Sequence, residues 1–342
     1  MSVRRSRAPA GRPLSVAVAG VAISGLAAAG AARGAYSALK RRPPGGEKAW
    51  SRTNHRGEAV TLLEGPAAAA GAIAGVLALA SLRSLAGSGP GPGRAAWRVA
   101  AAMTVAGAGA AAFGAYDDLA GSTGRRGFGG HLGALRHGEV STGAVKLGGI
   151  GTVGLASAAL TGGDAADVAI NAGLVAGLAN LLNLFDLRPG RAIKAAVASS
   201  ALIVLGGTGT AGSGATEALV PPLAAALAVL PEDLGERAML GDTGANAVGA
   251  MLGAAACGLP RPARVALLAG IAALTAASEK VSFTAVIART PVLHRLDMLG
   301  RRPASPARAI MIPAQRQGTI GPAGDTHTGR PAEDTDTAPP QE

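Results

Sequence analysis

Residues 165–186 read AADVAINAGLVAGLANLLNLFD, and this stretch decides the class of the fold. Ala, Leu, Val and Gly fill most of it, and about 20 such residues in an α-helix cross the ~30 Å hydrocarbon core of a membrane. Asn180, Asn183 and Asp186 follow one another at steps of three residues, so they share one stripe of the helix. The sequence predicts a membrane span with polar side chains at one end.

Similar apolar runs recur along the chain. They cover residues 14–32, 66–82, 99–116, 143–161, 192–209, 214–230, 243–259 and 263–288. Gly interrupts several of them, which membrane helices tolerate and use for close packing. We therefore predict an all-α, polytopic transmembrane bundle of about nine to ten spans over residues 14–300. A basic segment, 1–13, precedes it, and a Pro-, Gly- and Thr-rich tail, 301–342, is predicted to be disordered and cytoplasmic.

The composition of the whole chain supports a membrane protein. Of 342 residues, 49% are hydrophobic and 15% are charged, whereas a soluble domain carries about 25% charged residues. The formal net charge is +11, but the basic residues lie between long uncharged runs, so we expect no nucleic-acid partner. The lone Cys257 excludes a disulfide framework and a thiolate metal site.

Lys and Arg in the connecting segments predict the orientation. Most of them follow the first, third, fifth, seventh and ninth runs. The positive-inside rule places those segments in the cytoplasm and the N-terminus outside, although the Arg residues near the N-terminus weakly oppose this orientation. We expect a multi-pass protein of the cell membrane.

Carboxylates are few, and several fall at ends of the apolar runs. Asp117 and Asp118 end the third run, where adjacent carboxylates face the negative end of the helix dipole. A divalent cation would relieve this repulsion, and ligands that are all oxygen suit Mg²⁺. The alternative is a solvated pair neutralised by Arg125 and Arg126.

Asp242 opens the eighth run within Met239-Leu-Gly-Asp-Thr-Gly244. Asp242 or Thr243 can simply cap this helix, yet a helix N-terminus also binds anionic phosphate. For Asn180 and Asn183 the alternative is interhelical hydrogen bonding.

The remaining polar groups are weaker signals. Lys146 follows a Gly-rich loop that holds His131 and His137, Glu279 and Lys280 lie inside the last run, and His294 follows it. The carboxylates and His294 are all predicted at the cytoplasmic face. A carboxylate cluster flanked by Lys and Arg there suits a metal–diphosphate substrate that meets a lipid-borne acceptor.

Between Asn54 and Gly300 these segments, in order, resemble the polyprenyl-phosphate N-acetylhexosamine-1-phosphate transferases. The matching segments are Asp117-Asp118, Lys146 in Val-Lys-Leu-Gly-Gly, Asn180–Asp186 (the family's Asn-x-x-Asn-Leu-x-Asp), Met239–Gly244 (the family's Met-Gly-Asp-Thr-Gly), Glu279–Ser282 and Thr290–His294. The chain departs from the family at Pro189, where the family has a second Asp, and at the added Arg188 and Arg191. The family's multi-His loop is reduced to His294-Arg-Leu-Asp297, and the chain turns polar where a further span is usual.

The resemblance implies an Mg²⁺-dependent enzyme of cell-envelope glycan synthesis. In that reaction a polyprenyl phosphate attacks the β-phosphate of a UDP-amino sugar and UMP is released. Three catalytic residues carry over by position. Asp117 would be the base or orienter for the lipid phosphate, and Asp118 and Asp242 would bind or orient Mg²⁺.

Five further residues are candidates for binding the substrates. Lys146 would pair with phosphate, and Asn183 and Asp186 would contact the uridine diphosphate end. Asn180 and His294 complete the set.

Two alternative functions stay open. A catalytically silent homologue would bind polyprenyl phosphate or a cell-wall complex without turnover. A small-molecule transporter would also explain Gly-rich spans, but it predicts charges deep in the bilayer. A homodimer is compatible with either class.

Overall fold

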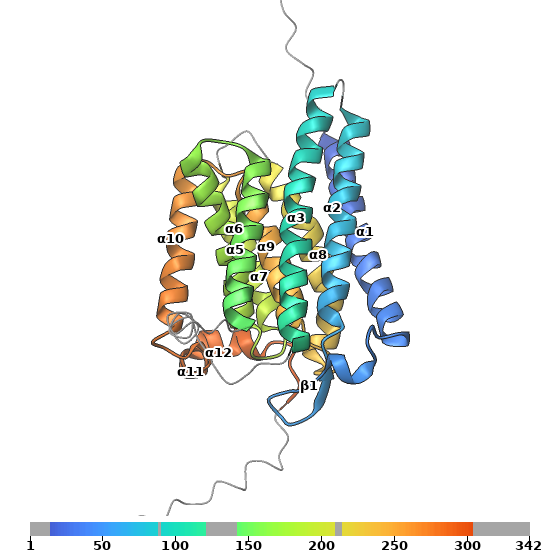
Figure 1. The fold of residues 1–342 in the computed structure, drawn as a ribbon, viewed down its shortest axis with the longest axis vertical. Helices are drawn as coiled ribbons and strands as arrows, with labels where there is room; N and C mark the ends of the chain where they lie inside the picture. Colours follow the sequence, from blue (N-terminus) through green and yellow to red (C-terminus); the bar gives the residue numbers. More distant parts are fainter. Residues whose placement is uncertain (1–13, 88–89, 121–141, 209–213, 304–342) are drawn as a thin grey trace, which may run out of the picture. The chain divides into compact units, whose positions relative to one another are not determined.

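The computed structural model describes residues 14–87, 90–120, 142–208 and 214–303. Within these ranges the chain is all-α apart from one short hairpin (Figure 1). The elements are α1 (Leu14–Arg41), η1 (Glu47–Trp50), β1 (Ser51–Thr53), β2 (Ala59–Thr61), α2 (Glu64–Ala86), α3 (Pro90–Ala120), α5 (Thr142–Thr161), α6 (Ala165–Phe185), α7 (Arg191–Gly206), α8 (Gly214–Leu234), α9 (Gly241–Ala256), α10 (Arg261–Ser278), α11 (Phe283–Arg289) and α12 (Pro291–Met298). The basic segment 1–13, the loop with Arg125, Arg126, His131 and His137, and the tail from 304 onward lie outside the described residues.

By helix length and hydropathy the chain is a multi-pass membrane protein. Among the described residues, α1, α2, α3, α6 and α8 are long and apolar enough to cross a membrane, and α10 with α11 adds a sixth span if this bent pair is counted as one. A helix forms in every predicted run, but α7 and α9 have only 16 residues each. The five or six spans counted by length and hydropathy are therefore fewer than the nine or ten predicted.

Apolar side chains cover much of the outside of the bundle. Leu26, Leu155, Leu202 and Leu205 are each more than half exposed. Soluble monomers rarely expose large apolar patches, because water contact with them is unfavourable. Hydrocarbon is the surrounding that suits these faces.

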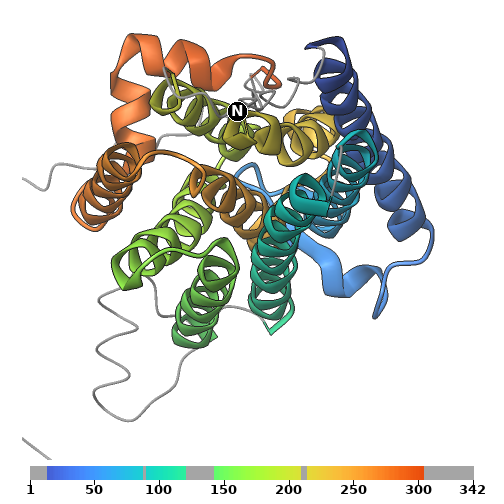
Figure 2. The same ribbon diagram turned by 90° about the horizontal axis from the view of Figure 1, so that it is seen from above.

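Helix α9 lies inside the bundle and packs against α2, α3 and α6 (Figures 1 and 2). Residues 243–256 are all buried. At Gly249 and Gly253, an added Cβ would overlap the backbone carbonyls of Leu178 and Leu174 in α6, so the two helices meet backbone to backbone. This antiparallel contact places the start of α9 beside the end of α6.

Successive helices run in opposite directions, which gathers several helix ends. The ends of α3, α6 and α8 and the starts of α2, α5, α7 and α9 share the end of the bundle that carries the hairpin, α11 and α12 (lower end in Figure 1). Thr61 pairs with the α8–α9 loop, because its backbone N–H donates to Arg237 at 3.3 Å and its carbonyl accepts from Met239 at 3.0 Å. The hairpin was not predicted, because strands of three residues carry too little alternation.

The predicted continuous helix over 263–288 is wrong. Helix α10 ends at Ser278, and α11 starts at Phe283 at an angle of 94° to it. Glu279 and Lys280 therefore lie in the break instead of inside a helix. The Ser282 hydroxyl accepts a hydrogen bond from Ala285 N–H at 3.4 Å and caps α11, and Phe283 stacks on Phe185 with ring centroids 5.2 Å apart.

Candidate functional site

Asp118, near the end of α3, holds the start of α9. Its Oδ1 accepts from the backbone N–H of Asp242 at 3.1 Å, and its Oδ2 accepts from the N–H and the hydroxyl of Thr243 at 2.9 and 2.7 Å. A carboxylate at a helix N-terminus satisfies free N–H groups and complements the dipole. The cap of α9 thus comes from another helix, and not from Asp242 or Thr243 as the capping alternative has it.

Lys146, in the first turns of α5, gathers two more carboxylates. Its ammonium pairs with Asp242 and lies 3.4 Å from Asp117 Oδ2. The carboxyl groups of Asp117 and Asp242 are themselves within hydrogen-bonding reach of each other. With the Asn183 amide turned to suit, its nitrogen donates to Asp242 Oδ1 at 2.7 Å and its oxygen accepts from Lys146 at 2.9 Å. Helices α3, α5, α6 and α9 therefore contribute to one polar cluster.

Asp186 directly follows α6 and is buried beside this cluster. The backbone N–H of Gly241 is close enough to favour its ionised form, whereas Oδ2 has no hydrogen-bond partner among the described residues. Burial, followed by the charges of Asp233 and Asp242, raises the pKa of Asp186 well above its usual range. A buried oxygen without a partner is unfavourable, so this position suits a ligand that supplies a donor.

Two further buried carboxyl groups were missed from the sequence. Asp233 at the end of α8 has an unpartnered Oδ2, and both oxygens of Glu64 at the start of α2 lack partners. Both groups are close enough to Asp186 for their charges to influence it. Each sits near the end of an apolar run, so the criterion that selected Asp117 and Asp118 would have found them as well.

Two predicted binding residues are not brought to the cluster. Asn180 is half-buried one turn earlier on α6, and His294 is exposed on α12. In the part of the chain that the structure describes, neither side chain forms a hydrogen bond or an ion pair with these carboxylates. The cluster thus unites Asp117, Asp118, Lys146, Asn183, Asp186 and Asp242.

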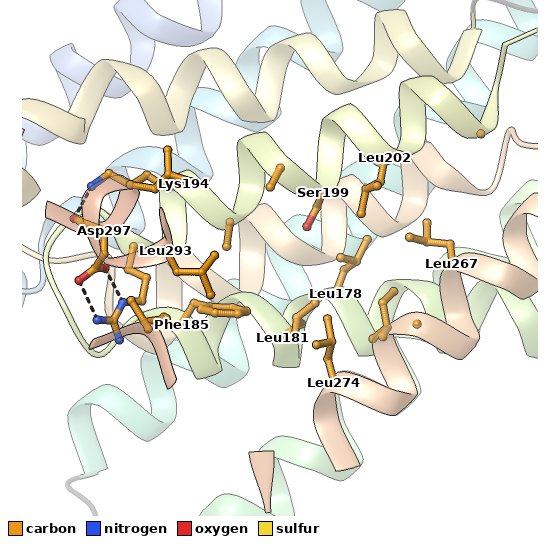
Figure 3. A pocket seen from close by; sticks show the side chains of 18 of the residues that line it. Leu178, Leu181, Phe185, Lys194, Ser199, Leu202, Leu267, Leu274, Leu293 and Asp297 are labelled. Atoms are coloured by element: carbon orange, nitrogen blue, oxygen red, sulfur yellow. Dashed lines mark hydrogen bonds and ion pairs between the residues drawn. The ribbon is translucent and has the colours of Figure 1, made fainter. Parts of the chain in front are cut away.

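Two cavities have lining residues at the end of α6. A polar cavity of about 520 Å³ is lined by Asp186, Asp233 and Glu236 together with Asn54, His55 and Arg188. Burial and the positive charge of Arg188 lower the pKa of His55, so its ring is neutral at pH 7. An apolar cavity of about 580 Å³ lies among α6, α7, α10, α11 and α12, with leucines along most of its wall (Figure 3). The consecutive residues Phe185 and Asp186 line the apolar and the polar cavity respectively.

The donor set fits Mg²⁺ only when a substrate supplies ligands. Among the described residues, no group of three or more His, Cys, Asp or Glu side chains is arranged to hold a metal ion. Asp118 has both oxygens occupied by α9, which leaves Asp117 and Asp242 as the better placed carboxylates. Mg²⁺ is commonly held by one or two carboxylates plus substrate phosphates and waters, and this pair meets that requirement.

Comparisons with known proteins do not assign the chain to a family. No protein-family model matches the sequence, and no curated protein is significantly similar to it. Support for a function therefore comes from the cluster, from the two cavities and from the motif resemblance.

Proposed function

We propose that this protein is a membrane transferase that moves a phospho-N-acetylamino sugar from a UDP-sugar to a polyprenyl phosphate and releases UMP. One observation carries the proposal: an acidic cluster with one lysine reaches a polar cavity through Asp186, and the preceding residue, Phe185, lines an apolar cavity. A reaction between a water-soluble nucleotide and a lipid phosphate needs these two compartments with a phosphate-handling site between them.

The polar cavity suits the nucleoside end of the donor. Ribose hydroxyls and base N–H groups are donors, and the unpartnered oxygens of Asp186 and Asp233 belong to carboxylates that line this cavity. Asn183 contacts Lys146 and precedes Asp186, which lines this cavity, by three residues, and we assign it a contact with the diphosphate. The apolar cavity suits the isoprenoid chain, because its walls are mainly leucine and alanine.

The chemical step is an in-line displacement at phosphorus. An oxygen of the lipid phosphate forms a bond to the β-phosphorus of the UDP-sugar, and the bond from that phosphorus to the bridging oxygen breaks, so UMP leaves with that oxygen. Lys146 offsets phosphate charge, and Asp118 positions Asp242 by fixing the start of α9. Little covalent chemistry is left to the protein, so positioning and electrostatics supply the rate.

When bound, Mg²⁺ would neutralise diphosphate charge, and Asp242 and Asp117 would hold it. The placement of this end of the bundle in the cytoplasm belongs to the same proposal. It places the polar cavity on the side where nucleotide sugars are available.

The test is release of UMP by the purified full-length protein. The assay contains Mg²⁺, a polyprenyl phosphate and a panel of UDP-amino sugars, and EDTA should stop it until Mg²⁺ is restored in excess. Asp242→Asn should remove activity, whereas Asp164→Asn, at the other end of α6, should retain it.

One observation favours the silent homologue, namely that Lys146 is already paired with Asp242 and that Asp118 has no free oxygen. Lipid binding without UMP release from any donor would establish that alternative and refute the transferase.

A further inference from the structure

Basic side chains gather at one end of the apolar cavity. Arg191 and Lys194 in α7 line the cavity, Arg188 lines the neighbouring polar cavity, and Arg301 follows α12. We call these four residues the α7 basic cluster. In Figure 3, Lys194 and Asp297 lie at one end of the apolar cavity, and Leu178, Leu202 and Leu267 extend away from them.

The buried carboxylate of Asp297 forms ion pairs with two members of this cluster. Asp297 accepts from Arg191 Nε at 2.7 Å and Nη2 at 3.0 Å, and from Arg301 Nη1 at 2.7 Å. Burial would raise the pKa of Asp297, but the Arg191 hydrogen bond and the charges of Arg191, Arg301 and Lys194 outweigh it, so the pKa is lowered. Asp297 is ionised at neutral pH, and it balances one of the four positive charges.

Two of the cations lack a carboxylate partner among the described residues. Lys194 Nζ donates to the backbone carbonyls of Asp297 and Leu299 at 2.7 and 2.8 Å, and Arg188 donates to the carbonyl of Leu187 at 3.2 Å. Asp233 is close enough for its charge to influence Lys194. Both cations are half-buried, so their charges are only partly screened by water.

The cations also repel one another. Burial and the charges of Arg191 and Arg301 lower the pKa of the Arg188 guanidinium. Such repulsion in a half-buried place favours binding of an anion, since an anion would offset several charges at once. A site for an anion at the end of an apolar cavity matches an amphipathic lipid, which has an anionic head group and an apolar chain.

We propose that the α7 basic cluster binds the phosphate head of an amphipathic lipid whose hydrocarbon chain occupies the apolar cavity. This inference deepens the proposed function, because it assigns the lipid-phosphate subsite to Arg188 and Lys194. Arg191 is mainly a positioning residue, since its guanidinium is already held by Asp297 and by Thr284 Oγ1 at 3.0 Å. Because Arg188 faces the polar cavity, a phosphate held here lies beside the compartment proposed for the nucleotide.

The test measures binding of farnesyl phosphate to the full-length protein in a neutral detergent, with farnesol and inorganic phosphate as separate probes. Lys194→Gln and Arg188→Gln should each weaken farnesyl phosphate about tenfold and leave farnesol unchanged, because a hydrogen bond to a charged group is lost. Arg295→Gln removes an exposed charge from α12 outside the cluster and should have no effect. Leu202→Gln in the cavity wall should weaken both isoprenoids.

Equal affinity for farnesol and farnesyl phosphate would overturn the proposal, as would unchanged affinity in both Gln variants. The lipid assignment would be overturned if inorganic phosphate bound as tightly as farnesyl phosphate and if Leu202→Gln changed neither affinity. Binding through the cluster without UMP release would refute only the transferase. UMP release by Lys194→Gln with an unchanged KM for the lipid would refute only the subsite.

Discussion

The two ends of α6 both carry clustered carboxylates, but they are partnered in different ways. At the N-terminal end, Asp164 and Asp167 form a capping box. Arg261 pairs with Asp164 at 2.6 Å and with Asp167 at 2.8 Å, and Arg264 pairs with Asp167 at 2.8 Å. Two carboxylates therefore meet two guanidinium groups, and Arg264 also donates to Asn171 at 2.7 Å.

The acidic cluster at the C-terminal end has more carboxylates than cations, and the α7 basic cluster is separate from it. Lys146 is the basic side chain that pairs with Asp117 and Asp242 there, and Asp186 keeps an oxygen without a partner. Asp233 and Glu64, close by, add three more such oxygens. A balanced network holds helices together, whereas an excess of buried charge costs stability unless a ligand offsets it. The contrast identifies the first end as structural and the second as the candidate site.

The largest expected effect is loss of activity at the C-terminal end. Asp242→Asn should lower UMP release by about a hundredfold or more, because it removes a charge that the phosphate-handling cluster uses. Steady-state UMP assays at saturating Mg²⁺ measure this. Asp164→Asn is the control at the other end and should change the rate by less than about twofold. Equal loss in both variants would end the distinction between the two ends.

A large loss of stability is expected at the N-terminal end. Arg264→Gln weakens the buried hydrogen bond to Asn171, so unfolding should become easier by about 2 kcal/mol. Asp167 keeps Arg261 as its partner. The loss of stability is measured by heating the protein in detergent and recording, at each temperature, the fraction that stays monodisperse. Below its lowered midpoint the variant should still release UMP at the wild-type rate. Arg261→Gln, on the same turn but half-exposed, should have a smaller effect.

Replacing Asp186 should separate activity from stability. Asp186→Asn keeps an oxygen for Gly241 N–H and removes a buried carboxyl group near Asp233. We expect an unfolding midpoint equal to or above that of the wild type, with a raised KM for the nucleotide sugar. A fall in midpoint as large as that of Arg264→Gln would show that Asp186 is a structural group.

Much of the site could be predicted, because the chain has few carboxylates and several of them lie at the ends of apolar runs. Asp117, Asp118, Asp186 and Asp242 were selected in this way. The capping of α9 by Asp118 could not be predicted, since it depends on the contact between α3 and α9 and not on local sequence. The break after Ser278 was missed although Glu279 and Lys280 mark it, because apolar residues resume directly after them.

The balance of charges around α7 was also beyond the sequence. Arg188 and Arg191 were noted as departures from the family pattern, but the pairing of Arg191 with Asp297 joins residues that are far apart in the chain. Spans were overcounted because apolar runs rich in Ala and Gly form helices without reaching membrane length, as in α7 and α9.

The smallest expected effect is on the unfolding midpoint, and it separates the stabilisation by the Asp164 helix cap from that by the ion pair of Asp164 with Arg261. Its side chain is 60% exposed, so its pairing with Arg261 adds little stability. Asp164→Asn keeps an oxygen that can accept from Asp167 N–H, now at 2.8 Å, and should hardly move the unfolding midpoint. Asp164→Ala removes the cap and should lower the midpoint measurably, with UMP release unchanged in both variants. If the two substitutions lower the midpoint equally, the charge of Asp164 stabilises this end of α6 and the cap does not.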